Sequence, residues 1–269
     1  MRLTAAEVAR VVGGTVDGAT DAVITGAEVD SRRLQQGDLF VALAGQRTDG
    51  HQFVGAALAT AAAALVTTGV DLPPVPQDRA LIRVSDPLQA YWDLARAERE
   101  KHDWTTVAVT GSVGKTTVKD FLTHLMTAYR PTGSTSGNRN STLGLPAQLL
   151  SQPLSVEVFV AVTGMSRPGE LDLLGRILQP IGVLLYTRIA PVHTEFFDGI
   201  EGIVKAKGEL LSYLADSGTL VVNADDRHQD GYPSQTPAKV LRYGAGGDAR
   251  IENLTDLGLL GSRFDLVLP

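Results

Sequence analysis

The segment Val107-Ala108-Val109-Thr110-Gly111-Ser112-Val113-Gly114-Lys115-Thr116-Thr117 decides the fold of this chain. An apolar strand enters a tight turn that contains two glycines, and a helical pattern begins directly after it. Glycine lets backbone amides approach phosphate oxygens, and the start of a helix adds partial positive charge. The segment therefore predicts a loop that binds the phosphates of ATP.

The residue types within this loop predict individual roles. We expect Lys115 to bridge the β- and γ-phosphates and the Thr116 hydroxyl to hold Mg²⁺. The usual spacing places a further glycine where Val109 stands, so the motif is a shortened form. A glycine-rich turn that only connects a strand to a helix is the alternative, and the strand–loop–helix context favours nucleotide binding. The candidate cofactor-binding residues are Gly111, Ser112, Gly114, Lys115, Thr116 and Thr117.

Around the loop, apolar strand patterns alternate with helical patterns. Strands with continuous apolar character separated by helices indicate a parallel sheet that is covered on both faces. We therefore expect an ATP-binding α/β domain over residues 103–269, with a mainly parallel sheet flanked by helices. The predicted strands are 106–110, 156–162, 181–189 and 218–223, and the predicted helices are 116–128, 168–178 and 200–214.

The first part of the chain predicts a smaller α/β domain over residues 1–102. Thr4 and Glu7 form a capping-box pattern at the start of a helix that runs to Val12. Asp86-Pro87 has the residue types of a helix N-cap and first turn. We predict a further helix over 52–63, strands over 22–29, 39–43, 64–67 and 80–84, and a domain boundary near residue 102.

Composition excludes several classes of function. The chain of 269 residues has a net charge of −6, which argues against a nucleic-acid binder, and it has no cysteine. The absence of cysteine excludes disulfides, thiolate zinc sites and cysteine nucleophiles. No signal peptide is visible, and the most apolar stretch, Ala56–Val66, is shorter than the roughly 20 residues of a membrane span. We expect a cytoplasmic protein without a membrane span.

Three further positions draw attention by their place in the pattern. His193 follows a predicted strand at the carboxyl edge, where α/β sheets bind ligands. Lys207 lies on a predicted helix, and Asn223 ends a predicted strand at the same edge. Taken alone, each also has a non-functional interpretation. His193 would be a structural histidine, Lys207 would lie with Glu209 on a solvated helix face, and Asn223 would belong to a turn.

Taken together, the motifs resemble the Mur ligase family in its order of segments, and the resemblance covers essentially the whole chain. Met165–Glu170 is particularly similar to the branch that adds D-alanyl-D-alanine. The segments that carry the resemblance, besides the phosphate loop and His193, are 30–32, 37–43, 49–53, 138–140, 144–146, 165–170, 206–209 and 223–226.

This resemblance implies an ATP-dependent ligase of peptidoglycan precursor synthesis. ATP would phosphorylate the terminal carboxylate of UDP-N-acetylmuramoyl-tripeptide, and the amine of D-alanyl-D-alanine would attack the resulting acyl phosphate. Such chemistry depends on positioning and on cations around the transferring phosphate. The resemblance also implies that the first domain binds the uridine nucleotide.

The resemblance assigns roles residue by residue. His193 and Lys207, the latter as a carbamate, match ligands of a second Mg²⁺, which makes them catalytic candidates beside Lys115. Asn223 matches a residue near the adenine. The substrate-binding candidates are Ser31, Arg32 and Asn138.

Two departures from the family pattern stand out. Val162 occupies the position of a metal-binding glutamate, and a valine supplies no oxygen to Mg²⁺; Arg188 replaces a usual asparagine. The family pattern also continues into a C-terminal domain that closes over the nucleotide, which a longer chain or a partner chain would supply. A binding protein that kept the fold without the chemistry is therefore an alternative to a ligase. A sister ligase that adds a diamino acid is a further alternative, which Met165–Glu170 disfavours.

Overall fold

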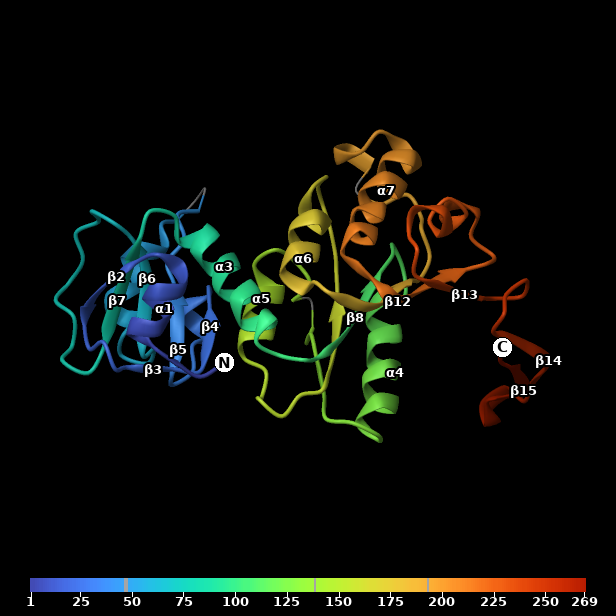
Figure 1. Ribbon diagram of the computed structural model, residues 1–269, viewed down its shortest axis with the longest axis horizontal. Helices are drawn as coiled ribbons and strands as arrows, with labels where there is room; N and C mark the ends of the chain where they lie inside the picture. The colour runs from blue at the N-terminus through green and yellow to red at the C-terminus, as the bar shows by residue number, and fades with distance from the viewer. Residues whose placement is uncertain (46–47, 138, 193) are drawn as a thin grey trace. The chain divides into compact units, whose positions relative to one another are not determined.

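The computed structural model describes residues 1–45, 48–137, 139–192 and 194–269 and contains two compact units (Figure 1). The first unit comprises Met1–Asp103 and Thr142–Val156, and the second comprises Trp104–Ser141 and Glu157–Pro269. The sequence placed all of 103–269 in one domain. The structure differs at Thr142–Val156, because helix α5 (Gly144–Leu150) buries its apolar side chains against α3 (Pro87–Glu100).

The first unit is built on a five-stranded mixed sheet in the order β2-β7-β6-β5-β4. Only the pair β2–β7 is antiparallel, and the remaining neighbours are parallel. A separate antiparallel pair joins β1 (Leu3–Thr4) to β3 (Val23–Ile24). The strands of the main sheet are β2 Thr15–Gly18, β4 Gly26–Glu28, β5 Asp38–Val41, β6 Ala63–Thr67 and β7 Ala80–Val84.

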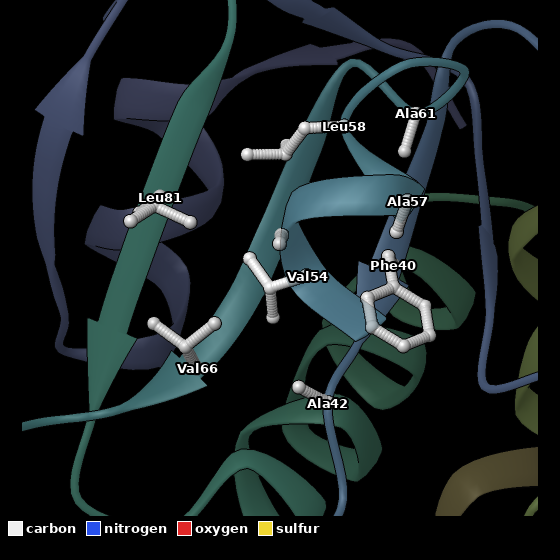
Figure 2. Packing of buried hydrophobic residues seen from close by; sticks show 9 residues of the cluster. Phe40, Ala42, Val54, Ala57, Leu58, Ala61, Val66 and Leu81 are labelled. Carbon is white, nitrogen blue, oxygen red and sulfur yellow. The ribbon is translucent and has the colours of Figure 1, made fainter. Parts of the chain in front are cut away.

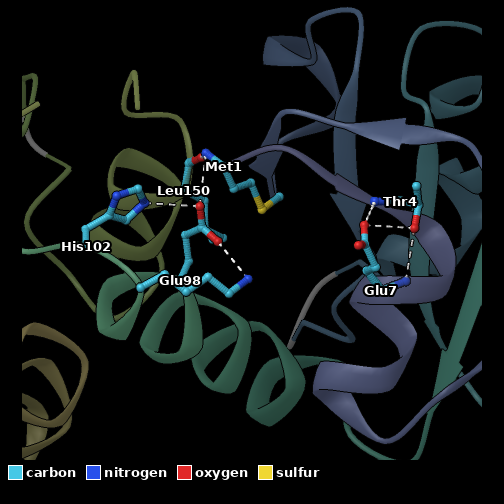
Figure 3. Close-up of polar contacts among 7 residues, drawn as sticks. Met1, Thr4, Glu7, Glu98, His102 and Leu150 are labelled. Carbon is cyan, nitrogen blue, oxygen red and sulfur yellow. Dashed lines mark hydrogen bonds and ion pairs between the residues drawn. The ribbon is translucent and has the colours of Figure 1, made fainter. Parts of the chain in front are cut away.

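The helix starts of the first unit follow the predicted caps. Helix α1 (Ala5–Val12) has a complete capping box, in which Thr4 and Glu7 each accept a backbone amide of the other (Figure 3). Asp86 caps α3 through the amides of Leu88 and Gln89.

The predicted helix over 52–63 is wrong in its extent. Helix α2 covers only Val54–Ala57, after a 3-10 turn at Gly50–Phe53. Ala63 and Ala64 instead pair with strands on both sides. Sheet pairing of a fully buried segment therefore overrides the helix preference of alanine.

The core of the first unit lies between one face of the sheet and α2. Phe40, Val66 and Leu81 project from three neighbouring strands toward Val54 and Leu58, and each is at most 3% exposed (Figure 2). Burial of each such side chain stabilises the fold by about 1.5–3 kcal/mol.

A buried ionic cluster also stabilises the first unit. The Glu98 carboxylate on α3 lies 3.6 Å from the amino group of Met1 and 3.3 Å from both Lys101 Nζ and His102 Nε2 (Figure 3). The Met1 amino group also donates to the carbonyl of Leu150, at 2.7 Å.

The second unit is built on a six-stranded sheet in the order β13-β12-β11-β8-β10-β9, in which every pairing is parallel. A fully parallel sheet confirms the fold class predicted from the apolar strands. The strands are β8 Thr105–Thr110, β9 Thr132–Ser134, β10 Val158–Val162, β11 Ile181–Tyr186, β12 Leu214–Asn223 and β13 Lys239–Tyr243.

Helices cover both faces of this sheet. Helix α4 (Lys115–Thr127) lies on one face, and α6 (Glu170–Leu178) and α7 (Gly199–Gly208) lie on the other (Figure 1). Val107, Val109, Val158 and Val160 form the core beneath α4. The predicted helix over 200–214 changes into a 3-10 helix at Glu209–Tyr213, and the predicted strand over 181–189 ends at Tyr186.

The remaining elements are short. An antiparallel hairpin joins β14 (Arg250–Asp256) to β15 (Ser262–Val267). Within the described ranges, no helix combines the length and the apolar character that a membrane crossing requires. Further 3-10 turns occupy Ser31–Arg33, Thr194–Phe196, Arg227–Gln229, Pro233–Gln235 and Gly258–Leu260.

Strand β8 lies at the point where the chain changes direction across the sheet. Its neighbours are β10 on one side and β11 on the other, and the helices that follow β8 and β10 lie on opposite faces. Ligands of open α/β sheets bind at the carboxyl ends of strands at such a switch point. The segment that follows β8 is Gly111–Gly114, so the topology places the predicted phosphate loop there.

Candidate phosphate-binding site

The loop between β8 and α4 has the backbone that a phosphate cradle needs. Gly111 has φ +141° and Gly114 has φ +87°, values that only glycine adopts readily. A Cβ at Gly111 would also lie 2.0 Å from Thr187 Oγ1, so no larger residue fits. Helix α4 begins at Lys115 and points its N-terminus at the loop, which favours an anion there.

Lys115 is folded back over the loop. Its Nζ donates to the carbonyl oxygens of Gly111, at 2.8 Å, and Ser112, at 3.2 Å. Burial lowers the pKa of Lys115 from its ordinary value. Both bonds are to neutral carbonyls, so the positive charge is held in place and remains available to an anion.

Beside the loop lies a pocket of about 210 Å³ at the carboxyl edge of the sheet. It brings together Gly111, Ser112, Lys115 and Lys207, four of the residues predicted from sequence. Its other lining residues follow strands β9, β10 and β11 or begin α6, and they are Asn140, Ser141, Gly164, Met165, Ser166, Glu170 and Val192.

Lys207 is a buried cation in this pocket. It lies on α7 and is only 2% exposed, so the interpretation as part of a solvated helix face is wrong for this residue. Burial first, and then the charge of Lys115, lower the pKa of Lys207 from 10.5 to about 7. Among the described residues, its ammonium group has no hydrogen-bond or ion-pair partner. An anion in the pocket would remove this penalty.

Glu209 also differs from the solvated-face interpretation. Its carboxylate accepts the backbone amides of Gly169 and Asp172, both at 3.0 Å, at the start of α6. It thereby caps a helix that begins forty residues earlier in the chain. These two hydrogen bonds fix the carboxylate at the start of α6.

Glu170 is the acidic side chain that lines the pocket. One carboxylate oxygen accepts the amides of Ser166, at 2.6 Å, and Arg167, at 3.1 Å. These bonds close the turn that carries Met165 and Ser166 into the pocket. The sequence resemblance singled out this segment but proposed no site residue in it; its position directly after β10 is the signal that was available.

The other predicted residues lie in different places. Thr116 and Thr117 occupy the first turn of α4 and are exposed, next to Lys115. Asn223 ends β12 at the same edge of the sheet, and its Oδ1 accepts the amide of Asp225 at 2.9 Å. Asn138 and His193 lie outside the described residues.

Ser31 and Arg32 lie in the first unit, in a separate pocket of about 470 Å³. The Arg32 guanidinium binds the Asp30 carboxylate with two contacts, at 2.9 and 2.8 Å. This bond and the amide of Arg32 hold the pKa of Asp30 at about 2. The Arg32 side chain is 86% exposed, so it is accessible to a ligand.

Few oxygen donors suited to a magnesium ion lie near the phosphate loop in the described residues. The exposed Thr116 hydroxyl at the helix start fits an ion carried by a nucleotide. Val162 is 2% exposed and ends β10 on the face that α4 covers, where it supplies no oxygen. Within the described ranges, no three His, Cys, Asp or Glu side chains gather in a way that could hold a metal ion. A second magnesium site with His193 and Lys207 stays a prediction, because His193 lies outside the described residues.

Comparison with known families gives two matches. The model of the Mur ligase middle domain matches residues 109–264, and that of the Mur ligase family catalytic domain matches residues 23–99.

Two curated relatives illustrate the similarity. The UDP-N-acetylmuramoyl-tripeptide–D-alanyl-D-alanine ligase of Bacillus subtilis (strain 168) is 35% identical over 95% of this chain and 56% of its own length. The corresponding ligase of Haemophilus influenzae is 31% identical over 100% of this chain and 59% of its own length. The chain thus spans between half and two thirds of these relatives.

Solved structures show the same fold. MurF from Acinetobacter baumannii superposes with a TM-score of 0.85 at 28% identity, covering 100% of this chain and 59% of that chain. MurF from Thermotoga maritima, solved in complex with ADP, has a TM-score of 0.75 at 30% identity, covering 90% of this chain and 55% of that chain.

Proposed function

Because the chain belongs to the Mur ligase family, we propose that it takes part in peptidoglycan precursor synthesis as an ATP-dependent ligase. The proposed reaction joins D-alanyl-D-alanine to UDP-N-acetylmuramoyl-tripeptide, the reaction named for its curated relatives. The observation that carries the proposal is the pocket that unites the phosphate loop with Met165–Glu170. We also propose a cytoplasmic location, where ATP is available.

Parts of the pocket have distinct tasks in this chemistry. The backbone amides at the N-terminus of α4 hold the phosphate oxygens. Lys115 neutralises the charge that moves between ATP and the peptide carboxylate, and Lys207, when protonated, adds a second positive charge in the same pocket. Mg²⁺ bound through Thr116 supplies further charge neutralisation when present.

The uridine end of the substrate is assigned to the first unit. We propose that Ser31 and Arg32 contact the diphosphate, because the 86% exposed guanidinium lies in a pocket at the start of a short helix. Asn223 is proposed near the adenine, and Asn138 is proposed as a substrate-binding residue. These assignments come from the matching positions of the family.

A second cation held by His193 and a carbamylated Lys207 is less well supported. The lowered pKa of Lys207 favours a neutral amine, the form that reacts with carbon dioxide. Val162, however, replaces the carboxylate that would share the ion.

Val162 also favours a second candidate function, a nucleotide- and UDP-peptide-binding protein without ligase activity. Phosphate release from Mg-ATP separates the two, with UDP-N-acetylmuramoyl-tripeptide and D-alanyl-D-alanine each present or withheld. Release that requires both substrates supports the ligase. Binding of the UDP-tripeptide without release under any condition supports the binding protein. Absence of both binding and release contradicts both proposals.

A further inference from the structure

The segment Thr187–Ala190, which follows β11, forms the wall against which the phosphate loop rests. Ser112 N donates to the carbonyl of Arg188 at 2.6 Å, and the Ser112 hydroxyl donates to the carbonyl of Ala190 at 2.8 Å. Thr187 Oγ1 donates to the carbonyl of Val113 at 2.7 Å. Three hydrogen bonds of the neighbouring loop residues Ser112 and Val113 thus depend on the position of this segment.

A buried pair of side chains holds the segment from its other side. Asp226 Oδ2 accepts the amide of Ile189 at 2.7 Å, and Gln229 Nε2 donates to the carbonyl of Thr187 at 2.9 Å. Asp226 is 8% exposed and Gln229 is 1% exposed.

Every polar atom of this pair is committed. Gln229 Nε2 also donates to Asp226 Oδ2 at 3.0 Å, and Gln229 Oε1 accepts the amide of Asn223 at 2.9 Å. The other oxygen of Asp226 accepts the amide of His228. A network with fixed partners holds one geometry, because each alternative leaves a buried group unpaired.

Tyr243, on the edge strand β13, holds the same segment through separate hydrogen bonds. Its hydroxyl lies 3.0 Å from the carbonyl of Tyr186 and 3.1 Å from that of Thr187. The segment is therefore attached to the ends of both β12 and β13.

We propose that Asp226 and Gln229 are positioning residues for the nucleotide phosphates, acting on the phosphate loop through Thr187–Ala190. Their hydrogen bonds fix the wall, and the wall sets the direction of the loop amides. The role of the loop as a nucleotide site rests on the proposed function, whereas the mechanical link from Asp226 to Ser112 does not.

The test compares Asp226→Asn with wild type by amide hydrogen exchange of the nucleotide-free protein. All three groups that face Asp226 are donors, so an amide nitrogen in the place of one carboxylate oxygen opposes a donor with a donor. Exchange at the Ser112 amide should rise about tenfold, the equivalent of one charge-assisted hydrogen bond, while amides in the middle of β8 change little. Equal acceleration of all core amides, or none at Ser112, overturns the link.

Nucleotide affinity tests the consequence for binding. In Asp226→Asn, the ADP affinity should fall about tenfold, whereas the affinity for adenosine, which has no phosphates, should fall by a clearly smaller factor. A purely structural defect would weaken both equally and would overturn the proposal. If wild type does not bind ADP, the proposed function fails, and hydrogen exchange still decides the link.

Two further variants complete the design. Tyr243→Phe removes the hydroxyl that bonds the Tyr186 and Thr187 carbonyls and changes no buried charge. It should therefore raise Ser112 exchange and lower ADP affinity by smaller factors, even if Asp226→Asn folds poorly. Asp230→Asn removes the same charge at an exposed position four residues farther on and should match wild type in both assays.

Discussion

Glu98 in the first unit and Lys207 in the second are both buried charged side chains, with exposures of 3% and 2%, but their surroundings are opposite. Glu98 has the Met1 amino group and Lys101 Nζ within 3.6 Å, and the His102 ring nitrogen at 3.3 Å. Lys207 has another cation, Lys115, as its main charged influence. A buried charge whose partners come from the fold stabilises structure, whereas one that the fold leaves unpaired is available to a ligand.

The largest expected effect concerns Lys207, the buried charge that has no partner among the described residues. The pKa of Lys207 falls from 10.5 in the unfolded chain to about 7, so by linkage its protonation costs on the order of 4–5 kcal/mol of stability. Because the unfolded state binds the extra proton, this cost is full below pH 7 and disappears as the pH rises to 10.5. Lys207→Met should therefore unfold at higher denaturant concentration than wild type at pH 6, with a difference that shrinks toward pH 10.

The exposed Lys205 on the same helix supplies the control for this measurement. Lys205→Met should leave the unfolding free energy within about 0.5 kcal/mol of wild type at every pH. A Lys207→Met variant that is less stable than wild type at pH 6 would show that Lys207 has a partner in the fold, which would end the contrast with Glu98.

The paired charge should behave in the opposite way. Glu98→Gln leaves the amino group of Met1 and the Lys101 ammonium without their anion, so the unfolding free energy should fall by about 3 kcal/mol. Glu100→Gln, at an exposed position on the same helix, should change it by less than about 0.5 kcal/mol. Chemical denaturation of both variants at pH 7 measures the difference, and equal stabilities would refute the structural role of the cluster.

Lys115 extends the comparison to ligand binding. Lys115→Met removes the cation that the phosphate loop holds in place, so the affinity for ADP should fall about 100-fold, the equivalent of two charged contacts. Isothermal titration with ADP measures this change, with Lys205→Met as the matched loss of charge. An affinity within twofold of wild type would mean that nucleotide phosphates do not bind at this loop.

Val162 gives the smallest expected change. Val162→Glu places a carboxylate at the end of β10, on the face that α4 covers. The nucleotide-free variant should therefore bind Mn²⁺ about tenfold more tightly than wild type. Val162→Gln is the control, since it has the same size without the charge. Identical Mn²⁺ titrations for the two variants would show that this position does not reach a cation.

Elements with strong local signals were predicted well. The caps at Thr4 and Asp86 mark where α1 and α3 begin, and the apolar run before Gly111 is strand β8. Elements that depend on distant partners were missed: β9 is three residues long and exists because it pairs with β10. The helix predicted over 52–63 was wrong in its extent, because α2 ends at Ala57 and Ala63 pairs in the sheet as the first residue of β6.

The sequence by itself determined the phosphate loop, its lysine and the parallel sheet around it, because glycine conformations, helix starts and apolar strands are local properties. Only the tertiary structure decided that Lys207 is buried beside Lys115, that Glu209 caps a distant helix, and that Asp226 holds the wall behind the loop. Burial and hydrogen-bond partners depend on which segments meet in space, and a single residue in one chain carries no signal for that.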